Sequence, residues 1–167
     1  MDSELIALSA ALGTACHQHQ LTITTAESCT GGWAAQVITH TAGSSGWFER
    51  GFITYSNAAK VDMLGVQQKT LDIYGAVSTE TAVEMAVGAI QNSNAMISLA
   101  ITGIAGPGGG SPGKPVGTVS FAWCGKGQPA EGEQRLFPGN REAIRRAAVK
   151  HALKGLLDRI NAGSLGL

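Results

Sequence analysis

Charged residues are scarce in this sequence, and neither sign predominates. Asp, Glu, Lys and Arg make up 14% of the 167 residues, and 12 basic residues balance 12 acidic ones. The typical charged share is ~25%. A protein that binds nucleic acid normally carries a basic face, so nucleic acid is not an expected partner. Disorder requires low hydrophobicity and high net charge, so a neutral chain with 44% hydrophobic residues is expected to fold.

Long apolar segments and a basic N-terminal segment are missing as well. No run approaches the ~18 apolar residues that a membrane-spanning helix needs. The first ten residues, MDSELIALSA, contain two acids where a signal peptide carries Lys or Arg. We therefore expect a cytoplasmic protein that has no membrane as its partner.

Cysteines are few and widely separated. Cys16, Cys29 and Cys124 form no CxxC pair, and an odd number at such spacing is neither a disulfide framework nor a zinc site. His17 and His19 lie two residues apart and are interpreted as a solvated helix end rather than as metal ligands. We expect no structural metal.

Helix-like and strand-like segments alternate in the first half of the chain, and strand-like segments follow one another later. Apolar spacing and capping residues predict helices over residues 3–18, 31–40, 67–72 and 79–91, one around Lys60 and one after Asn140. Strands are expected over residues 21–26, 50–55, 96–101, 117–124 and 133–137. This order predicts an α/β fold, a three-layer α/β/α sandwich with a mixed, mostly parallel sheet. The length fits a single domain over residues 1–167.

Glycine is plentiful, at 23 residues, and several glycines lie in a loop at residues 103–116. The loop imitates three motifs, a P-loop, a GxGxxG fingerprint and an SxxK pair, at residues 108–114, 108–113 and 111–114. Each of these motifs opens a helix or lies on one, whereas Pro112 and Pro115 interrupt any helix here. We reject all three. A loop of ~14 residues inside a compact domain is usually functional, and its amides are able to bind an anion; the alternative is a plain flexible turn.

The segment TAESCTGG, residues 25–32, is the clearest candidate for a site. It ends a predicted strand and opens a predicted helix, which is where ligands bind in open α/β sheets. The N–H groups of a helix N-terminus also favour anions. Ser28 stands on the turn and has two interpretations, an N-cap of the helix and a nucleophile. The segment taken alone favours the cap.

A serine nucleophile requires a base, and Lys60 is the candidate because no histidine lies at a strand end. Lys60 follows the second strand by one helical turn, and Ala58 and Ala59 leave apolar space around it. A desolvated lysine has a lowered pKa and is able to act as a base toward serine. The alternative, an ordinary surface lysine, is favoured by spacing alone. Thr102 and Gly103 close the third strand at the same edge, and together these residues predict a ligand-binding or hydrolytic site.

Five segments, in order and at matching spacing, resemble the CinA C-terminal domain family. They are TAESCTGG (25–32), GFITYSN (51–57) with Lys60, GAVS (75–78), TGIAGP (102–107) and KPVG (114–117). The resemblance runs over residues 5–160, essentially the whole chain. It implies an α/β/α fold, no metal, no cofactor and a homodimer.

The resemblance also implies an activity, the hydrolysis of nicotinamide mononucleotide to nicotinate mononucleotide and ammonia in NAD salvage. The family's nucleophile corresponds to Ser28 and its general base to Lys60, with Tyr55 as a supporting hydroxyl and Thr102 at the active site. Amides around Ser28 and Gly31 are expected to stabilise the oxyanion, helped by Thr102. Substrate contacts are expected from Glu27, Thr30, Gly31, Gly32, Gly103, Ala105, Gly106, Arg141 and Arg145.

Some alternatives stay open at this point. Asn140 stands where the family commonly has Asp, so the sequence does not decide whether Arg141 or Arg145 meets the substrate phosphate. Cys29 is a rival nucleophile, which we discount because its side chain is expected to point away from that of Ser28 and no histidine is placed to activate it. The rival functions are a non-catalytic pyridine-nucleotide-sensing module and a metal-dependent nucleotide pyrophosphatase. The latter usually needs several acids, and the strand ends offer only Glu27.

Overall fold

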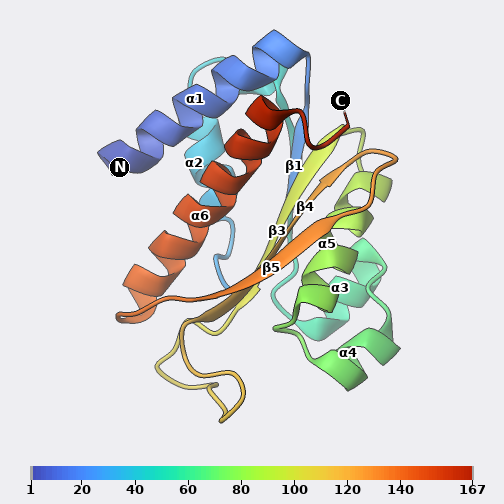
Figure 1. The fold of residues 1–167 in the computed structure, drawn as a ribbon, viewed down its shortest axis with the longest axis vertical. Helices are drawn as coiled ribbons and strands as arrows, with labels where there is room; N and C mark the ends of the chain where they lie inside the picture. Colours follow the sequence, from blue (N-terminus) through green and yellow to red (C-terminus); the bar gives the residue numbers. More distant parts are fainter. Residues whose placement is uncertain (1, 167) are drawn as a thin grey trace.

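A five-stranded sheet with helices on both faces forms the protein (Figure 1). The computed structural model describes residues 2–166. The strands lie in the order β2-β1-β3-β4-β5. Their bounds are β1 (Ile23–Glu27), β2 (Phe48–Ile53), β3 (Ile97–Gly103), β4 (Thr118–Gly125) and β5 (Glu131–Leu136).

The sheet is mixed, as expected, but only half of its strand pairs are parallel. β1 is parallel to β2 and to β3, whereas β4 is antiparallel to both β3 and β5. The prediction of a mostly parallel sheet is therefore too strong. A parallel neighbour needs a crossover connection of about a dozen residues or more, usually a helix. The β4–β5 turn is too short for one, and the loop between β3 and β4 returns without a helix.

Helices cover each face of the sheet with a separate apolar core. In Figure 1, α1 (Ser3–His19), α2 (Trp33–His40) and α6 (Arg141–Ala162) lie on one face. The other face carries α3 (Asn57–Leu64), α4 (Gln68–Tyr74) and α5 (Thr79–Gln91). Large side chains such as Trp123 and Phe121 fill the first core, while the sheet presents Ala26, Ala100 and Ala122 to the second. Because these alanines are small, α5 packs close to the strands.

Most element ends fall within three residues of the expected positions, and the capping residues are confirmed. Ser56, Ser78 and Asn140 accept hydrogen bonds from the backbone N–H groups of Ala59, Thr81 and Ala143 at the starts of α3, α5 and α6. The short 3₁₀ helix η1 (Ser44–Gly46) was not expected. It lies between α2 and β2.

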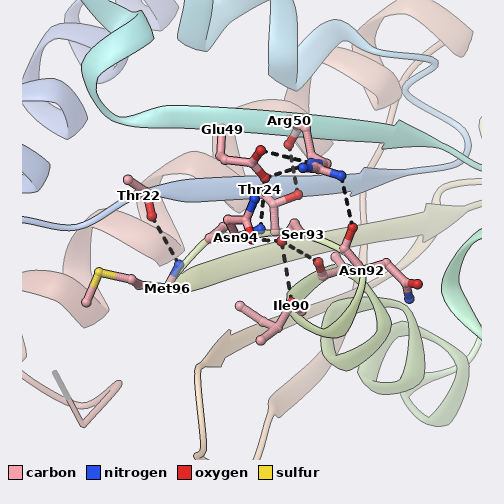
Figure 2. Close-up of polar contacts among 11 residues, drawn as sticks. Thr22, Thr24, Glu49, Arg50, Ile90, Asn92, Ser93, Asn94 and Met96 are labelled. Atoms are coloured by element: carbon pink, nitrogen blue, oxygen red, sulfur yellow. Dashed lines mark hydrogen bonds and ion pairs between the residues drawn. The ribbon is translucent and has the colours of Figure 1, made fainter.

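A polar network joins the amino ends of the strands to the α5–β3 connection (Figure 2). The Asn94 amide donates to Glu49 Oε2 at 3.1 Å, and Arg50 Nη1 donates to the Asn92 carbonyl at 3.2 Å. Thr24 Oγ1 donates to the Arg50 carbonyl at 2.8 Å. These contacts hold the edge strand β2 in register at the end of the sheet opposite the candidate site.

Four further expectations concern the cysteines, two histidines, membrane helices and metal ligands. All three cysteines are free and buried, and His17 and His19 are exposed at the end of α1, as expected of a solvated helix end. No helix within residues 2–166 is both long and apolar enough to cross a membrane. Among the same residues, no three His, Cys, Asp or Glu side chains lie close enough together to hold a metal ion.

Candidate active site

Ser28 lies on a tight turn between β1 and α2, and it does not cap the helix. Its amide donates to the Ile101 carbonyl at 2.9 Å, and its carbonyl accepts from the Gly31 amide at 3.0 Å. The N-cap of α2 is Gly32, which has no side chain to accept a bond. The cap interpretation of Ser28 is therefore wrong, and its hydroxyl is not needed for the helix.

Two glycines allow the chain to turn from Ser28 into α2. Gly31 has φ +58° and Gly32 has φ +101°, a region that favours glycine because other residues meet a Cβ clash there. A Cβ on Gly32 would also lie 2.9 Å from Cδ1 of Ile53. The helix expected to start at residue 31 therefore starts at Trp33. The positions of both glycines are explained by the turn itself.

Glu27 is buried beneath this turn and holds it from below. Its Oε1 accepts hydrogen bonds from Thr30 Oγ1 at 2.6 Å and from the Ala34 amide at 2.9 Å, and its Oε2 accepts from the Ala35 amide at 3.1 Å. A carboxylate at this point satisfies free N–H groups of α2 and interacts favourably with the helix dipole. Glu27 lines neither of the cavities described below, so the geometry gives it a structural position rather than the expected contact with substrate.

Lys60 is buried against Ser28, so the surface-lysine interpretation is wrong. The side chain is 1% exposed, and Nζ lies 3.0 Å from Ser28 Oγ. It also lies 3.0 Å from the Thr54 carbonyl and 3.4 Å from the Tyr55 carbonyl. Burial lowers the pKa of Lys60, because the charged form loses its hydration. No carboxylate pairs with it within residues 2–166.

The surroundings of Lys60 offer Nζ three hydrogen-bond acceptors, Ser28 Oγ and the Thr54 and Tyr55 carbonyls, which either charge state of the amine is able to use. A neutral amine has two N–H donors and one lone pair. The Thr54 and Tyr55 carbonyls are able to accept the two N–H groups, and the lone pair is then left for the Ser28 hydroxyl proton. The pair thus meets the geometric requirement for a nucleophile and its base, a separation within ~2.6–3.2 Å.

Ser28 and Lys60 open into a cavity of about 270 Å³, which we call the reaction cavity. Tyr55 and Thr102 line it too, although their hydroxyls have other partners. Thr102 Oγ1 donates to the Ala76 carbonyl at 2.8 Å, and Tyr55 OH accepts from Arg141 Nη2 at 3.1 Å. Tyr55 reaches the Ser28–Lys60 pair through its backbone carbonyl.

The backbone donors around Ser28 and Gly31 fall into two groups. The amides of Ser28 and Gly31 already donate to carbonyls. Those of Cys29 and Thr30 have no hydrogen-bond partner in the part of the chain that the structure describes. Unpaired amides beside a nucleophile are suited to stabilising an oxyanion. Of the amides around Ser28 and Gly31, those of Cys29 and Thr30 are therefore the ones free to donate.

The glycine-rich loop forms the opposite wall of the reaction cavity. It contributes Gly103, Ile104, Ala105, Gly106, Gly108 and Gly109. Arg141 Nη1 donates to the Gly106 carbonyl at 2.8 Å, and Lys114 Nζ donates to the Tyr74 carbonyl at 2.6 Å, so the loop is held at two points. The strand β4 follows it rather than a helix. Rejection of the three imitated motifs is confirmed.

The two candidate arginines have different surroundings. Arg141 lines the reaction cavity and also an adjoining second cavity of about 650 Å³. Arg145 lines only the second one, and its guanidinium donates to the Cys29 and Thr30 carbonyls. The second cavity is lined by Thr30, Gly31, Gly32, Trp33, Gln36, Arg141, Glu142 and Arg145.

The sequence did not identify several residues that line the reaction cavity, and the structure argues against Cys29 as the nucleophile. Asn57, Ala76 and Val77 line the reaction cavity; the GAVS segment was noticed but its role was not assigned. Cys29 is 7% exposed, and burial raises the pKa of its thiol to about 11. Near neutral pH it is a thiol rather than the reactive thiolate.

Taken together, the residues define a class of site: a serine hydroxyl 3.0 Å from a buried lysine amine whose pKa is lowered by burial, beside backbone amides without an acceptor among the described residues. Comparison with known proteins is consistent with that class. The family model of the CinA C-terminal domain matches residues 5–160, and the chain belongs to this family.

Individual relatives are similar over nearly the whole chain. The nicotinamide-nucleotide amidohydrolase PncC of Escherichia coli K12 is 53% identical over 155 residues, covering 93% of this chain and 94% of that protein. The PncC of Pseudomonas putida is 50% identical, covering 90% and 93%. The crystal structure of the competence/damage inducible protein CihA from Agrobacterium tumefaciens superposes with a TM-score of 0.92 at 44% identity, covering 96% and 98%.

Proposed function

We propose that this protein is a nicotinamide-nucleotide amidohydrolase that converts nicotinamide mononucleotide to nicotinate mononucleotide and ammonia. The contact of 3.0 Å between Lys60 Nζ and Ser28 Oγ in the reaction cavity carries the proposal. Similarity to PncC proteins, at about half of all positions, supports the substrate. In this function the product would return to NAD synthesis.

The first half of the reaction forms an ester on Ser28. Neutral Lys60 takes the hydroxyl proton as Ser28 Oγ attacks the carboxamide carbon. The resulting oxyanion is stabilised by the Cys29 and Thr30 amides, where the loss of one donor commonly costs on the order of 10²–10³ in rate. Protonated Lys60 then gives its proton to the departing nitrogen, and ammonia leaves.

The second half releases the acid. A water molecule loses a proton to Lys60 and attacks the ester carbon, so that nicotinate mononucleotide leaves and Ser28 recovers its proton. The Thr54 and Tyr55 carbonyls lie 3.0 and 3.4 Å from Lys60 Nζ and are able to accept hydrogen bonds from either charge state of the amine. Lys60 therefore exchanges a proton without changing its position, which supports its role in both halves.

Arg141 is the best-placed residue to hold the substrate phosphate. It lines both cavities, and its guanidinium is already directed across the mouth of the reaction cavity to Gly106 and Tyr55. A guanidinium binds phosphate through a planar fork of donors. Gly103, Ala105 and Gly106 then form the wall next to the nucleotide.

Ammonia release from nicotinamide mononucleotide tests the proposal. The assay compares the wild type with Ser28→Ala and Lys60→Ala, with EDTA present throughout. Lys69→Ala is a matched control, since Lys69 is an exposed lysine on α4. We expect turnover by the wild type and the control, and none by the two site variants.

The other outcomes separate the rival functions. Binding of nicotinamide mononucleotide without turnover by the wild type would favour the nucleotide-sensing module. In a separate assay without EDTA, cleavage of a nucleotide pyrophosphate that EDTA abolishes would favour the metal-dependent pyrophosphatase, which usually acts through metal-bound oxygens. The homodimer and the cytoplasmic location stay predictions, the first of which sedimentation analysis would test.

A further inference from the structure

Arg145 reaches from α6 to the turn that carries Ser28. Its Nε donates to the Cys29 carbonyl at 3.0 Å, and its Nη2 donates to the Thr30 carbonyl at 3.2 Å. The guanidinium lies 5.5 Å from the centre of the Trp33 ring. Within residues 2–166 it forms no ion pair with a carboxylate. The charge of Arg145 is thus directed at two backbone carbonyls.

These contacts determine where the neighbouring amides point. A peptide unit is planar and trans, so its C=O and N–H groups point in opposite directions. Holding the Cys29 carbonyl orients the Thr30 N–H, and holding the Thr30 carbonyl orients the Gly31 N–H. The Gly31 N–H in turn donates to the Ser28 carbonyl at 3.0 Å, which orients the N–H of Cys29. Of the three peptide units of the turn, Arg145 thus holds the Cys29 carbonyl and shares the Thr30 carbonyl with the Trp33 amide, which donates to it at 3.0 Å. It acts on the first unit only through the Gly31 N–H.

Two of those three units carry the unpaired amides. Cys29 and Thr30 donate to no acceptor among the described residues, whereas the Gly31 amide is used inside the turn. The Cys29 and Thr30 carbonyls carry partial negative charge in the same turn as Ser28. Arg145 holds both carbonyls and offsets that charge, which favours a developing negative charge nearby.

We infer that Arg145 is a positioning residue that orients the Cys29 and Thr30 amides for the oxyanion, rather than a ligand of the substrate phosphate. The inference rests on the proposed function. The two arginines then have different roles: Arg141 binds the substrate, and Arg145 orients the backbone amides of the turn. A residue that acts only on the transition state changes kcat, while a phosphate ligand changes substrate binding.

Steady-state kinetics with nicotinamide mononucleotide test the inference. Arg145→Gln is expected to lower kcat on the order of 10²-fold, the effect typical of misplaced catalytic groups, and to leave KM unchanged. Arg146→Gln is the matched control. Arg146 is the next residue on α6, and it pairs with Asp2 and Glu4 instead of the turn, so its kinetics should equal those of the wild type.

Direct binding provides the second readout. The Kd of nicotinamide mononucleotide is measured by calorimetry for Ser28→Ala and for the double variant Ser28→Ala/Arg145→Gln, neither of which turns the substrate over. Equal values support positioning. A Kd raised tenfold or more, with kcat retained in the single variant, would overturn the inference and make Arg145 a phosphate ligand.

The remaining outcomes also decide the question. If Arg145→Gln does not fold by circular dichroism, Arg145→Lys replaces it, because lysine keeps the charge but lacks the fork that spans two carbonyls. It should show the same selective loss of kcat, and a raised KM alone would contradict the inference. An inactive wild type would overturn the proposed function itself, which distinguishes that failure from a failure of the role of Arg145.

Discussion

The two ends of the sheet differ in whether their charged side chains form ion pairs. At the amino end, Glu49 and Arg50 pair at 2.7 Å with side chains 23% and 45% exposed, and both also bind the α5–β3 connection (Figure 2). At the carboxyl end, Lys60 is buried without a carboxylate partner among the described residues. The comparison teaches that ion-paired charges hold this fold together, while a buried amine without a carboxylate partner marks its candidate site.

Replacing the buried amine of Lys60 should have the largest effect. Lys60→Met keeps the length of the side chain but removes the base, so kcat is expected to fall by about 10⁴-fold or more. The free energy of unfolding should stay equal or increase, because an unpaired buried amine gives way to an apolar group. Ammonia release and thermal unfolding measure the two effects. A Tm lowered by several degrees would contradict the comparison.

The difference in the free energy of unfolding between the wild type and Lys60→Met should depend on pH, because burial lowers the pKa of Lys60. Above the ordinary lysine value of ~10.4, Lys60 is neutral in both folded and unfolded chains and costs no stability. As the pH falls toward its folded-state pKa, the unfolded chain binds the proton first, so the wild type loses stability relative to Lys60→Met. Conversely, kcat/KM of the wild type should rise with pH through the folded-state pKa. Equal stability differences at pH 7 and pH 10 would argue against a buried, perturbed lysine.

Glu27 is a buried carboxylate at the carboxyl end of the sheet whose oxygens accept hydrogen bonds, and Glu27→Gln removes part of this pairing. The amide's NH₂ would face the Ala34 or Ala35 N–H group, where the carboxylate now accepts. We expect a loss of about 2 kcal/mol in the free energy of unfolding, typical of a buried hydrogen bond to a charged group. Because the Ser28 turn rests on Glu27, kcat should fall as well. Urea unfolding measures the loss of stability, and steady-state kinetics measure the fall in kcat. Unchanged kinetics would mean that Glu27 does not influence the reaction.

The smallest effect is expected from the same substitution at the amino end. Glu49→Gln weakens partly exposed contacts with Arg50 and Asn94, which are worth less than about 1 kcal/mol. It should leave kcat and KM unchanged, because Glu49 lies at the far end of the sheet. Urea unfolding at low and high salt checks this, since salt should narrow the difference from the wild type. A large loss of activity would mean that the two ends are coupled.

Local patterns in the sequence predicted most of the fold. Capping residues and apolar spacing located the helices, because these signals act within a few residues of one another. The proportion of parallel pairs was overestimated, since a loop without a helix at residues 104–117 returns the chain antiparallel. Local patterns also favoured Ser28 as a cap, and the glycine at position 32 took that place instead.

The candidate site was predicted in part. Spacing placed Ser28, Lys60 and Thr102 at the ends of neighbouring strands, and the family resemblance assigned roles to them. What the spacing could not provide was the burial of Lys60 or the position of Glu27. Burial depends on which surfaces α3 and α2 pack against, and those contacts join residues that are far apart in the chain.

By itself, the sequence determined the α/β class, the helix caps, the family and the chemistry available at three strand ends. These depend on residue type and near neighbours. Only the tertiary structure decided that Lys60 loses its water beside Ser28, that Glu27 supports the turn from below, and that Arg145 crosses from the last helix to hold it. The physical reason is that pKa values, free donors and peptide orientation depend on what surrounds a group in space, which packing across the whole chain sets.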